Sequence, residues 1–189
     1  MKRVLAIALF AAAAVCMAQQ AQVRVDVNGA EDKVPLAAVK SEQGLSVDNP
    51  GWMKENKECY VCVSGGNKVG SDWTTYEFSF IPGKDGKVTL NFMGPWFKAQ
   101  DAKDITPIWV AYDNLIVTGA EVQNPNFDSL NDQGLFEGWE CNQANVVKGQ
   151  DGKNYAKAWH NQRIAQTVDV KKDQKVTVKF NIKAVEDKK

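Results

Sequence analysis

The sequence predicts an all-β protein with the fold of an antiparallel β-sandwich, and three observations lead to this class. After residue 18, valine outnumbers leucine by 20 to 6, a bias towards the β-branched side chains that suit pleated strands. Several segments alternate apolar and polar residues with a period of two, as strands with one buried face do. Turn pairs such as Asn28-Gly29, Asp85-Gly86 and Asp151-Gly152 separate these segments at the spacing of short strands.

Residues 1–18 have the features of a secretory signal peptide. A basic pair, Lys2-Arg3, precedes an apolar run over 4–15, and the run is followed by a small-x-small ending at Ala18. The run is too short for a membrane span and no later stretch is long enough, so we expect no transmembrane segment. We expect cleavage after Ala18 and a secreted, periplasmic or cell-surface protein.

Charge and length narrow the class further. The 189 residues carry 23 basic and 23 acidic side chains, and loss of the two basic residues of the signal peptide leaves 21 − 23 = −2. This balance provides no basic surplus for binding nucleic acid. The length suits one sandwich domain over 19–183, followed by a charged tail over 184–189.

The first half of the chain contains six predicted strands, and the clearest of them leads into a turn. Tyr76, Phe78 and Phe80 alternate with polar residues, and the turn cluster over 82–86 is followed by a second alternating segment. This arrangement is typical of a β-hairpin. The predicted strands of this half cover residues 23–27, 34–39, 59–63, 73–80, 88–92 and 109–117.

The second half repeats the pattern. Residues 164–170 and 176–182 alternate in the same way and are separated by the polar turn 171–175, which predicts a second hairpin. A shorter strand is predicted over 155–158. No segment after the signal peptide keeps a helical period for three turns.

Three cysteines remain after the signal peptide: Cys59, Cys62 and Cys141. An odd number in an exported chain leaves at least one thiol free or paired between chains. We interpret them as buried structural cysteines with room for one bridge to Cys141, and their scattered spacing does not suit a zinc module.

Two segments resemble parts of one known family. Residues 124–128 read Asn-Pro-Asn-Phe-Asp, residues 138–139 read Gly-Trp, and an alternating segment over 155–182 follows them. Residues 71–119 contain an aromatic strand and then Tyr-Asp-Asn over 112–114. The stretch 121–183 resembles the opening half, and 23–119 the closing half, of jelly-roll carbohydrate-binding modules of the xylan- and glucan-binding type, in the galactose-binding-like superfamily.

The two halves stand in the reverse of the family order, and two explanations are open. The chain is either one circularly permuted jelly roll or a complete domain at 23–120 followed by a truncated second copy. Half a jelly roll would leave open sheet edges and an uncovered apolar face, which is costly. Burial therefore favours the permuted single domain.

Carbohydrate binding needs flat aromatic rings that stack on sugar rings, with amides and carboxylates around them for the hydroxyl groups. Trp73 and Trp139 are expected in the core, because one begins an alternating strand and the other holds the family's Gly-Trp position. The candidate ligand-binding residues are Trp52, Trp96, Tyr155, Trp159, His160, Asn161 and Gln162.

The resemblance also implies a structural calcium ion, since modules of this family often hold one between the opening segment and the last strand. The matching acids are Asp113 and Asp128, and carboxylate oxygens suit Ca²⁺. The other interpretation is that both residues cap turns. We expect no cofactor to be required beyond this possible ion.

The sequence hypothesis is an exported, non-catalytic sandwich that binds a polysaccharide or other glycan. The alternative is a structural or adhesive module that contacts another protein or oligomerises, aided by the free cysteine. A small glycoside hydrolase is the third possibility, since Glu77, Glu137 and Glu140 could supply paired carboxylates. The single histidine, His160, lies in a polar segment without a nucleophile motif, so we assign no catalytic residue.

Overall fold

The computed structural model describes residues 23–28, 34, 36–42, 45–48, 58–63 and 69–185. Side chains are described for residues 34, 36 and 69–185. The predicted signal peptide at 1–18, Trp52 and residues 186–189 lie outside the described residues, as do the side chains of Cys59 and Cys62.

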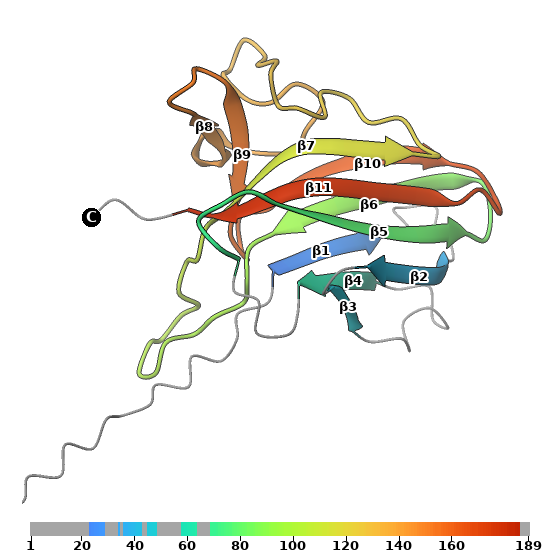
Figure 1. Ribbon diagram of the computed structural model, residues 1–189, viewed down its shortest axis with the longest axis horizontal. Coiled ribbons are helices and arrows are strands. Elements are labelled where there is room, and N and C mark those ends of the chain that lie inside the picture. Colours follow the sequence, from blue (N-terminus) through green and yellow to red (C-terminus); the bar gives the residue numbers. More distant parts are fainter. Residues whose placement is uncertain are drawn as a thin grey trace, which may run out of the picture.

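The described chain forms two antiparallel sheets that pack face to face, which confirms the predicted all-β sandwich (Figure 1). Sheet A has the strand order β10-β6-β1-β4-β3, and sheet B has the order β2-β5-β11-β7-β9-β8. Within the described part the only helical element is a 3-10 turn, η1, over Gln143–Asn145. The strands are β1 (Val23–Asn28), β2 (Leu36–Glu42), β3 (Leu45–Asp48), β4 (Glu58–Val63), β5 (Thr74–Pro82), β6 (Gly86–Met93), β7 (Val110–Thr118), β8 (Val146–Lys148), β9 (Asn154–Ala158), β10 (Ile164–Val170) and β11 (Val176–Ala184).

Strands from both stretches of the chain meet in both sheets. In sheet B, β11 lies between β5 and β7 and hydrogen-bonds to each along its length. In sheet A, β10 forms the edge beside β6. The stretch after residue 120 therefore supplies a central strand of one sheet and an edge strand of the other.

Both predicted hairpins are wrong. The strands β5 and β6 lie in different sheets, and so do β10 and β11, so each of these connections crosses from one sheet to the other. The actual partners are β5 with β11 and β6 with β10. Alternation shows only that a strand has one apolar face, and the inner faces of both sheets point to the same core, so the pattern cannot tell a hairpin from a crossing connection.

The two crossing connections lie against each other at one end of the sandwich. The Asp85 carboxylate accepts a hydrogen bond from the Lys172 backbone N–H at 2.8 Å and forms an ion pair with Lys171 at 3.4 Å. The Asp173 N–H donates to the Pro82 carbonyl at 2.9 Å. These contacts connect the turn before β6 to the turn before β11. The β5–β6 and β10–β11 connections therefore pass from one sheet to the other side by side.

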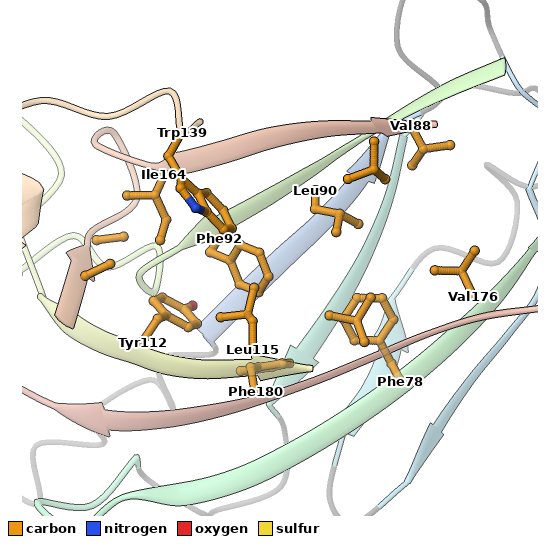
Figure 2. Packing of buried hydrophobic residues seen from close by; sticks show 14 of the residues in the cluster. Phe78, Val88, Leu90, Phe92, Tyr112, Leu115, Trp139, Ile164, Val176 and Phe180 are labelled. Carbon is orange, nitrogen blue, oxygen red and sulfur yellow. The ribbon is translucent and has the colours of Figure 1, made fainter. Parts of the chain in front are cut away.

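Aromatic rings from both stretches form the centre of the core (Figure 2). The Phe92 ring of β6 lies 5.2 Å from the ring of Tyr112 and 5.7 Å from that of Phe180, measured between centroids. Phe180 also contacts Phe78, and Trp139 contacts Phe92. All five side chains are buried, Trp139 as predicted, and their edge and tilted contacts are the favoured aromatic geometries.

The segment 119–145 contacts both sheets, through hydrogen bonds of Pro125 with Leu115 of β7 and of Glu140 with Ala165 of β10. Phe127 and Phe136 are buried beside Trp139, whose indole N–H donates to the carbonyl oxygens of residues 123 and 124. Gly138 has φ +78°, a conformation that glycine adopts without steric cost, and it precedes the buried tryptophan. The motif residues that carry the family resemblance thus serve packing.

Short strands and strand ends differ from the prediction. The strands β3 and β8 have four and three residues, too few for alternation to be recognised, and the sequence does not predict them. The last strand extends to Ala184, and the Val185 N–H bonds to the Trp109 carbonyl at 3.2 Å. The ordered backbone therefore runs two residues past 183.

Replacement of Phe180 by alanine tests the dependence of one stretch on the other. Its ring partners, which include Phe78 and Phe92, come from residues 69–118, and we expect Phe180→Ala to lower the free energy of unfolding by about 3–5 kcal/mol. Urea unfolding followed by tryptophan fluorescence measures the change. Ile116→Ala, at a side chain that is 56% exposed, is the control and should change it by less than about 0.5 kcal/mol. Equal effects would show that Phe180 does not connect the two stretches.

Candidate functional site

Two predicted ligand-binding residues, Tyr155 and Trp159, project from the outer face of sheet B. In β9 the side chains of Ala156 and Ala158 are fully buried in the core, so the alternating residues at 155, 157 and 159 point outwards. The strand lies at the end of the sandwich from which residues 94–109 extend (Figure 1). Side chains from β11 and from the residues just before β5 and β7 reach the same face and join them.

Trp73, Tyr155 and Lys183 form one half of a cluster on this face. The Trp73 and Tyr155 rings meet edge to face at 5.8 Å between centroids. The Lys183 Nζ lies 4.6 Å from the centroid of the Trp73 ring and 5.1 Å from that of Tyr155. An ammonium at this distance is attracted by the negative ring face.

The other half consists of Trp109, Trp159 and Lys157. The two indole rings lie 6.4 Å apart between centroids, and the Lys157 Nζ lies 4.4 Å from the Trp109 ring centroid. We call the whole cluster the aromatic–lysine surface, and its members are Trp73, Trp109, Tyr155, Lys157, Trp159 and Lys183.

A small buried residue lies at the centre of this surface. Ala111 pairs with Lys183 on one side and with Lys157 on the other. It alternates with the core residues Val110 and Tyr112, so it faces outwards, yet it is fully buried. Side chains of the outer face must therefore cover it, and the lysine stems and rings beside it are the groups in position to do so.

The predicted residues His160, Asn161 and Gln162 belong to the tight turn between β9 and β10. The backbone groups of Trp159 and Gln162 bond to each other in both directions, at 3.2 and 3.0 Å, and leave His160 and Asn161 at the tip. The Gln162 side-chain oxygen accepts a hydrogen bond from the Trp159 indole N–H at 3.0 Å. Gln162 therefore orients the tryptophan ring.

A buried asparagine holds this turn from behind. The Asn145 amide donates to the carbonyl oxygens of Lys157 and Gln162, at 2.7 and 3.2 Å. Its side-chain oxygen accepts from the Asn142 N–H, and the Gln162 amide donates to the Asn142 side chain. A buried asparagine whose amide and oxygen both make hydrogen bonds gives the turn one defined shape.

Trp96 is the most exposed tryptophan of residues 69–185, at 52% of its full exposure. It follows Gly94, which packs directly on the Trp159 backbone: a Cβ at residue 94 would lie 2.6 Å from the Trp159 Cα. Two residues of chain span at most about 7 Å, so Trp96 starts close to Trp159. Within the described residues, the Trp96 ring contacts no other aromatic ring.

The prediction that Trp73 is a core residue is wrong. Its side chain is 38% exposed and lies on the outer face, because Trp73 precedes β5 and Thr74 pairs with the inward-facing Ile182. Sequence reasoning also missed Lys157 and Lys183 as site residues. Their signal was present, since each lysine alternates with core residues and must face outwards, but only the strand pairing shows that they flank Ala111.

The predicted calcium ligands lie near each other in an acidic group. Burial raises the pKa of Asp113, the negative charges of Asp128 and Asp151 raise it further, and a hydrogen bond from the Asn114 N–H and the charge of Lys153 oppose the rise. Among residues 69–185, however, no three acidic, histidine or cysteine side chains come together as a metal site. The calcium site at Asp113 and Asp128 therefore stays a prediction, carried by two carboxylates near each other.

A row of polar side chains runs beside the aromatic–lysine surface. Asn181 of β11 pairs with Thr75 of β5 and with Asp113 of β7, so all three share the outer face. The Thr75 hydroxyl donates to the Asn181 side-chain oxygen at 2.7 Å. This row places an amide, a hydroxyl and a carboxylate one pleat away from the lysines.

Cys141 is a free thiol and does not form the bridge that the sequence allowed. It is half-buried against the core. Burial raises the pKa of its thiol, and a hydrogen bond with the Phe136 backbone opposes this rise.

Comparison with protein families, with characterised protein sequences and with solved structures found no match to this chain. The structure itself adds one finding on membranes: within the described residues, no helix is long and apolar enough to cross a bilayer.

Replacement of Asp113 by asparagine tests the acidic group. A carboxyl whose pKa is raised on folding loses stability as the pH rises from its unfolded value of 3.8 through the folded value. Asparagine carries no charge and keeps an acceptor for the Asn114 N–H, so we expect Asp113→Asn to raise the Tm at pH 7 by roughly 1–3 °C. The gain should shrink as the pH is lowered towards 4, which differential scanning fluorimetry can follow.

The same Tm measurement with added Ca²⁺ shows whether Asp113 binds calcium. If the carboxylates bound calcium, Asp113→Asn would lower the Tm in calcium buffer, and EDTA would remove the difference.

The Cys141 thiol should react slowly. Because the thiolate is the reactive form, partial burial and a raised pKa should slow its reaction with a disulfide reagent at pH 7 by about ten-fold relative to a free cysteine peptide. Stopped-flow measurement on a variant with Cys59→Ser and Cys62→Ser isolates this thiol. A rate equal to that of the peptide would contradict the half-buried position.

Proposed function

We propose that this protein is an exported, non-catalytic carbohydrate-binding module that binds a glycan on the aromatic–lysine surface of sheet B. The observation that carries the proposal is the gathering of four aromatic side chains on one outer sheet face, next to a row of hydrogen-bonding groups. The apolar face of a sugar ring packs well on such rings, and the polar neighbours can receive its hydroxyl groups.

Exposed aromatic side chains on this face need a reason. Tryptophan side chains are mostly buried in folded proteins, and contiguous apolar patches on the surface of a domain commonly mark binding sites. Here Trp73 is 38% exposed, and the rings of Tyr155 and Trp159 are partly exposed although the inner side of the same strand is fully buried. The partial exposure of these aromatic rings is therefore confined to the outer face of the strand.

The shape of the site favours a chain-like ligand. From Trp73 before β5 to Trp159 after β9, the surface crosses β11 and β7, so it is about four strands wide, or about 15 Å between the outer backbones. Trp96, which starts near Trp159, extends this surface towards the segment 94–109. Several sugar rings in a row fit such a length better than one.

The strand pairing also supports the proposed relationship to galactose-binding-like jelly rolls in permuted order. A permuted single domain requires the stretches 23–119 and 121–183 to share both sheets, as they do. It also requires the short link from Gly119 to Asn124 to join the end of one half to the start of the other, and the Leu115 N–H does bond to the Pro125 carbonyl at 3.1 Å across that link.

Alanine substitution of the surface tryptophans tests the function. We expect Trp73→Ala and Trp159→Ala each to weaken glycan binding about ten-fold or more, because each removes a ring from the centre of the site. Trp96→Ala should have a smaller effect at the margin. A glycan array followed by isothermal titration calorimetry with the best oligosaccharide gives these numbers.

Ile116→Ala is a matched control, since Ile116 lies on the outer face of β7 away from the cluster and is 56% exposed. Unchanged affinity in this variant and lost affinity in the tryptophan variants would support the site. Binding that survives in both tryptophan variants would place the ligand elsewhere. A flat array together with concentration-dependent oligomers in light scattering would favour the protein-contact alternative.

A further inference from the structure

We infer that the glycan bound on the aromatic–lysine surface is acidic, with its negative groups held by Lys157 and Lys183. This inference rests on the proposed function and adds the charge of the ligand. It follows from the positions of the two ammonium groups, from the aromatic rings beside them, and from the lack of a neighbouring carboxylate among the described residues.

The strand register places the two lysines symmetrically. Lys183 and Lys157 pair with the same residue, Ala111, from opposite sides, so their backbones lie two strand spacings apart, or about 10 Å. Both side chains rise from the same outer face and end over aromatic rings. A ligand lying across β7 would reach both cations.

Among the described side chains, no carboxylate neutralises either cation. Within residues 69–185, no carboxylate oxygen lies within 4.0 Å of the Nζ of Lys157 or Lys183, and their neighbours are rings. A ring face occupies one side of an ammonium group, which has three N–H donors. The remaining donors are suited to an anionic oxygen of a ligand, whose bond to a partly buried cation is stronger than that of a neutral hydroxyl.

The nearby acids do not cancel this preference. The charges that shift the pKa of Asp113 are those of Asp128, Asp151 and Lys153. The face therefore has a cationic row beside the tryptophans, and an acidic group that begins at Asp113, one pleat away, and includes Asp151 in the β8–β9 turn. A polyanion would bind along the cationic row and be repelled from the acidic group.

Matched pairs of polysaccharides test this inference with the intact protein. Polygalacturonate is compared with its fully methyl-esterified form, which has no charge, and dextran sulfate is compared with dextran, each by affinity electrophoresis and calorimetry. We expect at least one charged member to bind about five-fold or more tightly than its neutral partner, and the preference to fall between about 50 mM and about 300 mM salt. The two pairs separate carboxylate from sulfate recognition.

The lysines are tested by neutral and charged replacements. Lys157→Gln and Lys183→Gln keep part of the stem that covers Ala111, and each should weaken binding of the charged glycan by about two- to five-fold while binding of the neutral partner stays constant. Lys183→Arg should retain the affinity. Lys175→Gln is the matched control and should have no effect. It also removes one positive charge, but Lys175 lies just before β11 begins, at the opposite end of the strand from Lys183.

Several outcomes overturn the inference. Equal affinity for both members of both pairs would show that the ligand is neutral, while the proposed function would stand. An equal loss in Lys175→Gln, or equally tight binding of polyglutamate, would show attraction of any polyanion without a sugar site. If the unaltered protein bound no glycan, charged or neutral, the proposed function itself would be contradicted.

Discussion

The insertion of β11 between β5 and β7 is the constraint on which the rest of the structure depends. Each sheet of a sandwich has an apolar face that only the other sheet can cover. Here β11, from the end of the described chain, completes the middle of sheet B, and Phe180 on that strand contacts rings from β5, β6 and β7. Without β11, sheet B would be interrupted in its middle and the core rings of β5, β6 and β7 would lose their contact with Phe180.

The same constraint builds the outer face. Since Phe180 and Ile182 must point inwards, Asn181 and Lys183 must point outwards, and the pairing of β11 with β7 then sets Lys183 beside Ala111. A shift of one residue in this register would bury the lysine and expose the phenylalanine. The position of the proposed site is thus a consequence of core packing, because the register that buries Phe180 also fixes the side chains on the exposed side of the sheet.

The sequence predicts where strands lie far better than which strands pair. Period-two alternation locates β10 to the residue, because Ile164, Val168 and Val170 share one buried face. It fails for the connections after β5 and β10, where a local hairpin and a crossing between sheets bury the same side chains. Trp73 shows the same limit at a single residue, because its face depends on the pairing of Thr74 with Ile182 across the sheet. Tyr155 and Trp159 could be named as candidates from their aromatic type and polar sequence neighbours, whereas their lysine neighbours required the register.

The covered alanine gives the surface a property that scattered exposed rings would lack. Because Ala111 is small, the stems of Lys157 and Lys183 can lie over it, and the adjacent rings contact each other at centroid distances of 5.8 and 6.4 Å. Side chains that are already ordered lose little conformational entropy when a partner binds. A larger residue at position 111 would lift the lysines away from the rings and separate the two halves of the surface. The size of one buried side chain therefore controls both the arrangement of the aromatic rings and the placement of the charges beside them.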